Sequence, residues 1–211
     1  MHKWGIPSSL FHFGVKRLEG ALITPDCYHK DEFLDIWCGM KWILLTDDGK
    51  EAKCISVKPE FKKGIDDQYG DSSVCVKVPE SGYLISGVKL KLGPATRAFI
   101  GRSPYFPQRD SVVVSLLEQK KYCFLSKTLH SNEFIYLLYN GNSRFMLFAF
   151  RDRDALYGIR WIGDMDGDGR LDVVLDASDH YNVSILRLFL SSEATSGELL
   201  RFEAQLRSAG E

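Results

Sequence analysis

The sequence predicts a mainly β protein whose antiparallel strands form a sandwich, a barrel or a meander. Short runs of β-branched and aromatic residues recur roughly every 10 to 15 residues along the chain. Turn-forming residues separate these runs, and no convincing helical periodicity lies between them. Strands that follow one another without intervening helices are expected to pair as hairpins, which excludes a parallel βαβ fold.

The first half of the chain is predicted to begin irregularly and then to form strands. We expect an irregular N-terminal segment over residues 1–35 and a single β domain over residues 36–211. The stretch Asp47-Asp48-Gly49-Lys50 predicts a hairpin turn, because Asp-Gly supplies the positive φ that such turns need. Residues 58–72 are charged and contain glycine, which predicts an exposed loop. The strands predicted in this half cover residues 37–45, 52–57, 74–78 and 83–92.

The second half is predicted to continue as hairpins up to the C-terminus. In the clearest of them, Asn140-Gly141-Asn142-Ser143 lies between two apolar runs. Strict alternation over residues 200–207 favours a last strand, and a helix presenting Leu199, Phe202 and Leu206 is the alternative. The other strands predicted in this half cover residues 98–101, 112–117, 121–126, 134–139, 144–150, 157–162, 173–175 and 183–190.

Length, composition and charge bound the class of protein. A chain of 211 residues with 45% apolar residues can bury a substantial core and is typical of a globular protein. With 27 basic and 28 acidic residues, the net charge of −1 gives no support to nucleic-acid binding. No apolar run approaches the roughly 18 residues of a membrane-spanning helix, so no membrane span is expected.

Cysteine usage leaves two interpretations open. The five cysteines include no close pair of the kind that binds zinc or forms a redox dithiol. Either some of them form disulfides, which leaves at least one free thiol, or several are buried free thiols that act as small hydrophobes. Any disulfide is expected to tie the N-terminal part together, since four cysteines lie within the first 75 residues.

The strongest chemical signal lies in residues 164–172, which read Asp-Met-Asp-Gly-Asp-Gly-Arg-Leu-Asp. Hard oxygen ligands at alternate positions, wrapped by a glycine turn, are what Ca²⁺ requires. The bland alternative is an acidic, solvated turn. The predicted ligands are the carboxylates of Asp164, Asp166, Asp168 and Asp172 and the backbone carbonyl of Arg170.

The residues around this loop indicate its type. An EF-hand would have a bidentate Glu at position 12 and helices on both sides, whereas this chain has Leu175 there and strand-like flanks. Residues 163–172 match the pattern Gly-Asp-x-(Asn/Asp)-Gly-Asp-Gly-x-x-Asp, so the loop resembles the calcium loops of FG-GAP and related VCBS-type repeats. The resemblance implies a bound Ca²⁺ and covers only the loop and its flanks. FG-GAP propellers repeat the motif in each blade, and this chain has a single copy.

The C-terminal region carries a second resemblance. Residues 161–192 contain Asp179-His180-Tyr181-Asn182 and Leu188-Phe189-Leu190-Ser191-Ser192 after the calcium-type loop. In this they are similar to the C-terminal part of uncharacterised secreted or periplasmic bacterial proteins. The resemblance implies a compartment, periplasmic or extracellular, more than an activity. Because weak calcium sites work where calcium is millimolar, the loop also favours export over a cytoplasmic location.

No catalytic motif with a known spacing occurs in the sequence. A polar group follows the loop, however, and three interpretations of it remain. It could be a hydrogen-bonded turn, a second shell around the metal ligands, or an acid/base set beside the cation. The residues concerned are Asp176, Asp179, His180 and Asn182.

These observations together predict a calcium-stabilised β protein without catalytic activity that is exported and binds another macromolecule. A periplasmic immunity or inhibitor-type protein with a protein partner is one concrete version. One alternative is a calcium-dependent hydrolase that uses Asp176, Asp179 and His180. Another is an adhesion or carbohydrate-binding module that uses exposed aromatic side chains such as Trp4, Tyr105 and Phe106.

Overall fold

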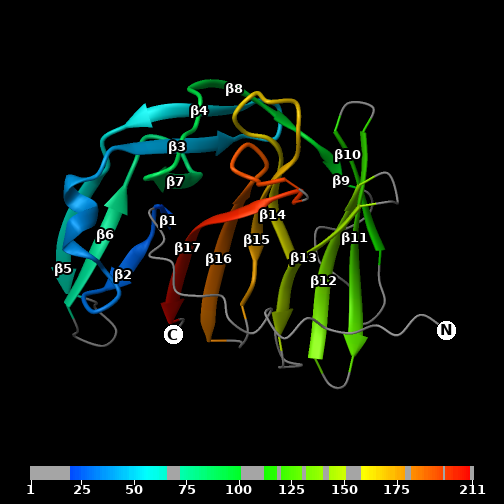
Figure 1. The fold of residues 1–211 in the computed structure, drawn as a ribbon. Helices are drawn as coiled ribbons and strands as arrows, with labels where there is room; N and C mark the ends of the chain where they lie inside the picture. Colours follow the sequence, from blue (N-terminus) through cyan, green and yellow to red (C-terminus); the bar gives the residue numbers. More distant parts are fainter. Residues whose placement is uncertain are drawn as a thin grey trace.

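A computed structural model confirms the mainly β, antiparallel fold (Figure 1). Within its described part the strands form three sheets, and the one helical element is the short 3-10 helix η2 (Asp35–Gly39). The structure describes residues 20–65, 72–100, 112–117, 120–129, 132–139, 143–150, 158–178, 182–196 and 198–209.

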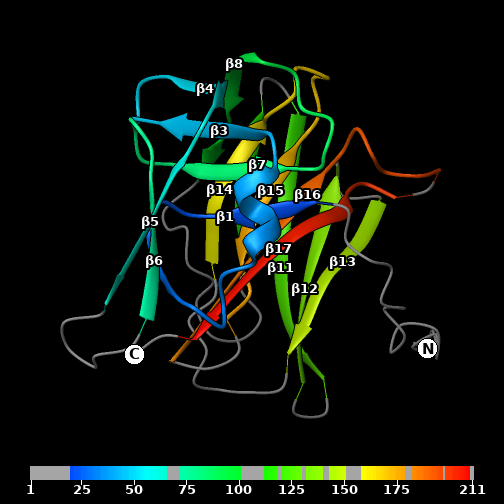
Figure 2. The same ribbon diagram turned by 90° about the vertical axis from the view of Figure 1, so that its left-hand side faces the viewer.

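The largest sheet curls until its two edge strands, β1 and β17, lie against each other, as in a nearly closed barrel (Figure 2). Gly20 permits this approach, because a Cβ there would lie 2.6 Å from the backbone carbonyl oxygen of Glu203. In spatial order the strands of this sheet are β1 (Ala21–Ile23), β7 (Tyr83–Ser86), β3 (Trp42–Asp47), β4 (Ala52–Val57), β8 (Gly93–Arg97), β14 (Gly158–Asp164), β15 (Asp172–Asp176), β16 (Val183–Leu190) and β17 (Arg201–Ala209).

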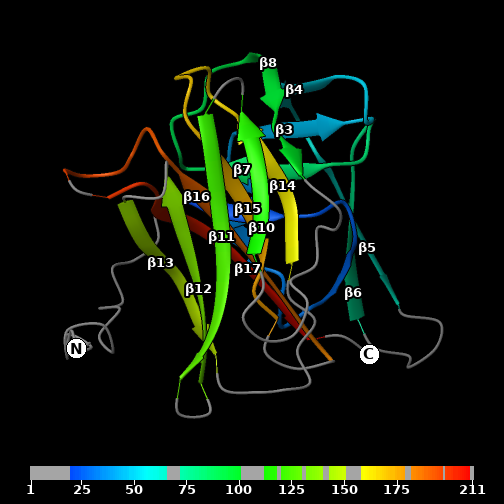
Figure 3. The same cartoon turned by 90° about the vertical axis from the view of Figure 1, so that its right-hand side faces the viewer.

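Two smaller sheets flank the barrel. Figure 3 looks onto the five-stranded sheet, with β14 to β17 behind it. Its strands, in spatial order, are β13 (Ser143–Phe150), β12 (Asn132–Tyr139), β11 (Lys120–Leu129), β10 (Val112–Leu117) and β9 (Phe99–Ile100). The three-stranded sheet consists of β2 (Cys27–His29), β6 (Ser72–Lys77) and β5 (Glu60–Ile65).

The described residues form two apolar cores that share β14 to β17. The first core fills the curled sheet, and the second contains residues of β14 to β17 together with Leu117, Tyr122 and Phe124 of the five-stranded sheet. Successive side chains of a strand point to opposite faces. On β15, Val174 belongs to the first core and its neighbours Val173 and Leu175 to the second. Asp172 and Asp176, which share the face of Val174, therefore lie on the barrel side.

Most predicted hairpins are confirmed. Gly49, with φ +84°, lies in the turn between β3 and β4, as its Asp-Gly sequence predicts. The pairs β10–β11, β12–β13 and β14–β15 also form as predicted. The alternating residues 200–207 belong to strand β17, so the alternative of a C-terminal helix is wrong.

Four boundary predictions are wrong. Residues 20–35 are not irregular, because they contain β1 and β2, and the predicted loop over 58–72 contains β5. Strands β1 and β2 pair with partners distant in the sequence, so no local hairpin signal marks them, whereas β5 pairs with the next strand, β6, but is mostly exposed and charged. The strand predicted over 37–45 begins only at Trp42, because Trp37 belongs to η2. The strand predicted over 83–92 ends at Ser86, although Val88 and Leu90 still pack against the first core.

One disulfide decides in part between the two interpretations of the five cysteines, disulfides or buried free thiols. Cys27 and Cys75 lie directly opposite each other on β2 and β6 and are joined by a disulfide. The three other cysteines, Cys38, Cys54 and Cys123, are free, and Cys54 is buried. No helix in the described ranges is long and apolar enough to cross a membrane.

Candidate metal centre

The acidic loop joins two adjacent, buried strands. Asp164 ends β14 and Asp172 begins β15, so the predicted strand-loop-strand arrangement is confirmed. Gly167 and Gly169 have φ of +79° and +72°, a conformation that side chains with a Cβ rarely adopt. Gly163 is needed for close approach, since a Cβ there would lie 2.2 Å from the backbone carbonyl oxygen of Thr96 on β8.

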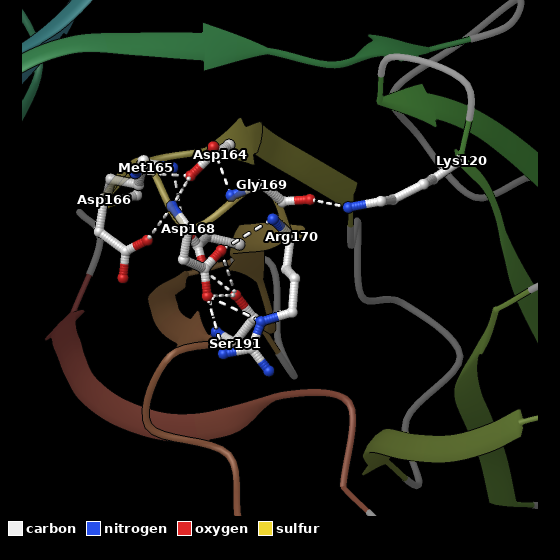
Figure 4. Close-up of polar contacts among 10 residues, drawn as sticks. Lys120, Asp164, Met165, Asp166, Asp168, Gly169, Arg170 and Ser191 are labelled. Atoms are coloured by element: carbon white, nitrogen blue, oxygen red, sulfur yellow. Dashed lines mark hydrogen bonds and ion pairs between the residues drawn. The ribbon is translucent and has the colours of Figure 1, made fainter.

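Three aspartates of the loop gather their carboxylates in one place. Figure 4 shows two of them, Asp164 and Asp166, in the loop. One carboxylate oxygen from each of Asp164, Asp166 and Asp172 lies within 4.8 Å of the others. Asp172 is fully buried, Asp164 is 8% exposed, and Asp166 is partly exposed. Buried carboxylates that face one another repel and lose hydration, so such a cluster is costly unless protons or a cation offset the charge.

Asp164 organises the loop backbone. Its carboxylate accepts hydrogen bonds from the N–H groups of Gly167 at 2.7 Å, Asp168 at 3.1 Å and Gly169 at 2.9 Å. These bonds wrap the chain around one carboxylate, which is how a short loop can present further oxygens toward a common centre.

Asp172 connects the loop to β16. Its carboxylate accepts hydrogen bonds from the Met165 N–H at 2.7 Å and from the Ser191 N–H at 2.8 Å, and the Ser191 hydroxyl lies 3.0 Å away. Burial raises the pKa of Asp172 to about 7, against the lowering effect of these hydrogen bonds and with a further increase from the charge of Asp166. Burial, followed by the charges of neighbouring aspartates, also raises the pKa of Asp166.

Asp168 and Arg170 face each other at the side of the cluster. The Asp168 carboxylate forms an ion pair with the Arg170 guanidinium at 2.8 Å and accepts a hydrogen bond from the Arg170 N–H at 2.8 Å. Asp168 is therefore outside the group of three, although its carboxylate oxygens lie 3.2 and 3.3 Å from the Ser191 hydroxyl. Direct ligation by Asp168 and by the Arg170 carbonyl stays a prediction.

Three residues distant in the sequence support the loop, and sequence reasoning missed them. Ser191 follows β16, and Lys120 of β11 donates a hydrogen bond from its amine to the Gly169 carbonyl. The Cys54 thiol of β4 donates to the Met165 carbonyl at 3.6 Å. Burial raises the pKa of Cys54 to about 12, so the thiol stays protonated. No local pattern marks these residues, because only the folded sheet order brings them to the loop.

Of the polar group that follows the loop, two residues, Asp176 and Asn182, are described, and both lie at the end of β15 and β16 away from the loop. Asp176 lies at the opposite end of β15 and accepts hydrogen bonds from Arg160 Nε at 3.0 Å and from the Ser178 N–H at 3.1 Å. Asn182 is exposed in the turn before β16. The remaining predicted residues, Asp179, His180, Trp4, Tyr105 and Phe106, lie outside the described residues.

The carboxylate cluster fits a hard divalent cation. All three side chains offer oxygen and none offers nitrogen or sulfur, which disfavours zinc. Calcium binds oxygen at about 2.3–2.6 Å, so two oxygens on one ion lie at most about 5 Å apart. The 4.8 Å limit on the cluster is compatible with that span. The group could thus hold a metal ion, whose identity the geometry leaves open.

Comparison with known proteins assigns no family. No model of a known protein family matches the chain. Neither curated proteins nor solved structures give a significant match. Fold and site together define a mainly β, antiparallel protein with a candidate cation site in a strand-loop-strand hairpin.

Proposed function

We propose that this chain is a calcium-stabilised β protein without catalytic activity, which acts outside the cytosol by binding another macromolecule. The observation that carries the proposal is the convergence of Asp164, Asp166 and Asp172 between β14 and β15. A cation there would offset the repulsion of three carboxylates, two of which are buried. It would act structurally, because the loop connects both apolar cores through Met165 and Leu171.

Calcium binding is tested first by thermal unfolding of the metal-free protein with and without added calcium. Calcium at 100 times its Kd would stabilise the fold by about 2.7 kcal/mol, which corresponds to roughly 5–10 °C in a domain of this size. Asp166→Asn should abolish most of this increase. Asp166 is suited to the test because the hydrogen bond that its carboxylate accepts from the Asp168 N–H is long, at 3.3 Å, so the variant should still fold.

Asp31→Asn is the matched control, since Asp31 is an exposed aspartate that lies far from the loop in the sequence. It should keep the full response to calcium. An equal response in Asp166→Asn and wild type, or no response in either, would refute a structural calcium site at this cluster. Repeating the titration with magnesium would show whether the smaller ion substitutes for calcium.

The disulfide supports action in an oxidising compartment. Disulfides such as Cys27–Cys75 persist in secreted and periplasmic proteins and are rare in the cytosol. Calcium at millimolar concentration is found in the same compartments, so the disulfide and the acidic loop point in one direction. Fractionation of the native source, with detection of the protein in each fraction, tests this part. Exclusive recovery from the cytosol would contradict it.

Exposed apolar side chains support binding of a macromolecule. Leu34 is 52% exposed, and Ile36 in η2 and Ile65 in β5 are each 70% exposed. Phe33 and Phe61, whose ring centroids lie 5.3 Å apart, connect the η2 region to β5. Leu34 and Ile36 lie two residues apart in the η2 region, and neighbouring exposed apolar side chains are typical of interaction surfaces.

The binding surface is tested by capture on the immobilised protein from extracellular or periplasmic extract. A specific partner should bind wild type and should be lost with the double variant Leu34→Ser/Ile36→Ser. The control Leu92→Ser removes a side chain that is equally exposed, at 52%, but lies next to β8. A partner that binds all three proteins equally would place the interface elsewhere.

A further inference from the structure

A polar cavity lies on the large sheet, apart from the acidic loop. Its volume is about 390 Å³, and its walls come from β3, β7, β8 and β14 and from the segment between β1 and β2. Small-molecule sites begin at roughly 300 Å³, so the cavity suits a small ligand. Two arginines, Arg97 and Arg160, line it together with Tyr83, Ser81 and Asp47, and no residue of the loop 164–172 does.

The carboxylates beside these arginines already have hydrogen-bond donors within the protein. Asp47 accepts from the Gly49 N–H at 2.8 Å and from Trp161 Nε1 at 3.0 Å. Asp176 accepts from Arg160 and from Ser178 and is 5% exposed. Both carboxylates are therefore already engaged by donors of the protein itself.

The donors that line the cavity are in excess. The Arg97 side chain is 54% exposed, and its Nε lies 3.5 Å from the Asp47 carboxylate. At 3.5 Å this contact is longer than an ordinary N–H···O hydrogen bond, so Asp47 holds the guanidinium only loosely. A guanidinium carries five N–H donors in a planar fork that matches a carboxylate or phosphate. Burial raises the pKa of Tyr83, so its hydroxyl stays protonated and can donate as well.

We propose that this cavity binds a small ligand that carries an oxyanion, either a carboxylate or a phosphate. The Arg97 guanidinium would hold the oxyanion through its terminal amino groups, and the Tyr83 and Ser81 hydroxyls would contact the remaining polar atoms. A volume of about 390 Å³ suits a ligand of about the size of an acidic monosaccharide. The site is separate from the proposed calcium site and does not depend on it.

Isothermal titration of the calcium-loaded full chain with three probes tests the proposal. The probes are glucuronate for the carboxylate, glucose 6-phosphate for the phosphate, and glucose as the uncharged control, in a buffer without phosphate. We expect saturable binding of at least one acidic probe and none of glucose. Arg97→Gln should weaken that binding roughly tenfold or more, since hydrogen bonds to a charged group are lost.

Two further variants keep the test decisive. Arg201→Gln is the matched control, because Arg201 is a partly exposed arginine paired with Glu203 at 3.3 Å on β17 and does not line the cavity. It should bind like wild type. Tyr83→Phe keeps the ring and removes only the hydroxyl, so it should weaken binding severalfold even if Arg97→Gln fails to fold.

The titrations of wild type and variants either support the proposed oxyanion site or overturn it. Binding of one acidic probe identifies which oxyanion the cavity prefers, and loss of that binding in Tyr83→Phe or Arg97→Gln supports the site. Absence of saturable binding by both acidic probes would overturn the proposal. Binding that is unchanged in both Tyr83→Phe and Arg97→Gln would also overturn it. If Arg97→Gln does not fold, unchanged binding in Tyr83→Phe is enough to overturn it.

Discussion

Asp172 holds the loop, β16 and the candidate cation site together. Its carboxylate receives the N–H groups of Met165 and Ser191, which lie on opposite sides of it in the sequence. In a fully buried position such a group is favourable only when its charge is neutralised or its hydrogen bonds are complete. The same residue thus serves the fold when protonated and would serve a metal when ionised.

Metal-free protein should lose stability as the pH rises. The folded-state pKa of Asp172 is raised by burial to about 7, above the ordinary value of 3.8 for an aspartate. Between these values the folded state binds a proton that the unfolded chain releases, so the free energy of unfolding falls as pH increases from about 4 to about 7. Urea unfolding of metal-free protein at pH 5, 6, 7 and 8 measures this, and Asp172→Asn should remove the contribution.

Calcium should reverse that trend, because it competes with the proton for the same carboxylates. The stabilisation gained on adding calcium should therefore be larger at pH 8 than at pH 5. A calcium effect that is independent of pH would indicate that Asp172 does not take part in binding.

At the scale of elements, β8 connects the two halves of the large sheet. It pairs with β4 over three residue pairs and with β14 over two, and Pro94 within it has no N–H to donate. Because so few residue pairs join β8 to its neighbours, this part of the sheet depends on close approach of the strand backbones. Gly163 provides this approach at the point where β14 leads into the acidic loop.

Gly163→Ala should destabilise the fold by roughly 2 kcal/mol or more, because its Cβ would lie 2.2 Å from the Thr96 carbonyl oxygen and 2.8 Å from the Trp161 ring. Chemical denaturation measures the change in the free energy of unfolding. Gly39→Ala is the control, since no atom lies within 4 Å of the Cβ it would add, and its effect should stay within about 0.5 kcal/mol. Equal effects of the two substitutions would disprove the close approach of β8.

Across the whole molecule, the disulfide restricts the unfolded chain more than it shapes the folded one. Cys27 and Cys75 are 48 residues apart, and closing a loop of that length removes chain entropy worth up to about 4 kcal/mol. Reduction should therefore lower the free energy of unfolding by about 2–4 kcal/mol. Urea unfolding with and without reductant measures the difference. The variant Cys27→Ser/Cys75→Ser should be insensitive to reductant, and a wild-type protein that is equally insensitive would argue against the pairing.

The large sheet also explains why a metal loop at one hairpin can affect the entire fold. Strands β14 to β17 contribute to both cores, and Met165 and Leu171 place one loop residue in each. Loosening the loop would therefore disturb both cores together, so calcium is expected to shift one cooperative transition.

Sequence alone determined the features that depend on neighbouring residues. These are the mainly β class, the hairpins around Gly49 and around residues 140–143, and the strand-loop-strand setting of residues 164–172. Turn chemistry and apolar alternation act over a few residues, so they can be recognised without knowing the partners of a strand.

Only the tertiary structure decided the features that depend on distant partners. It paired β1 with β7 and β2 with β6, closed the large sheet, and selected Asp164, Asp166 and Asp172 as the converging carboxylates. It also brought Ser191 to the loop and directed Asp176 to Arg160 instead. Such pairings follow from sheet order and closure, and the free energy that fixes them comes from burying side chains of segments far apart in the sequence.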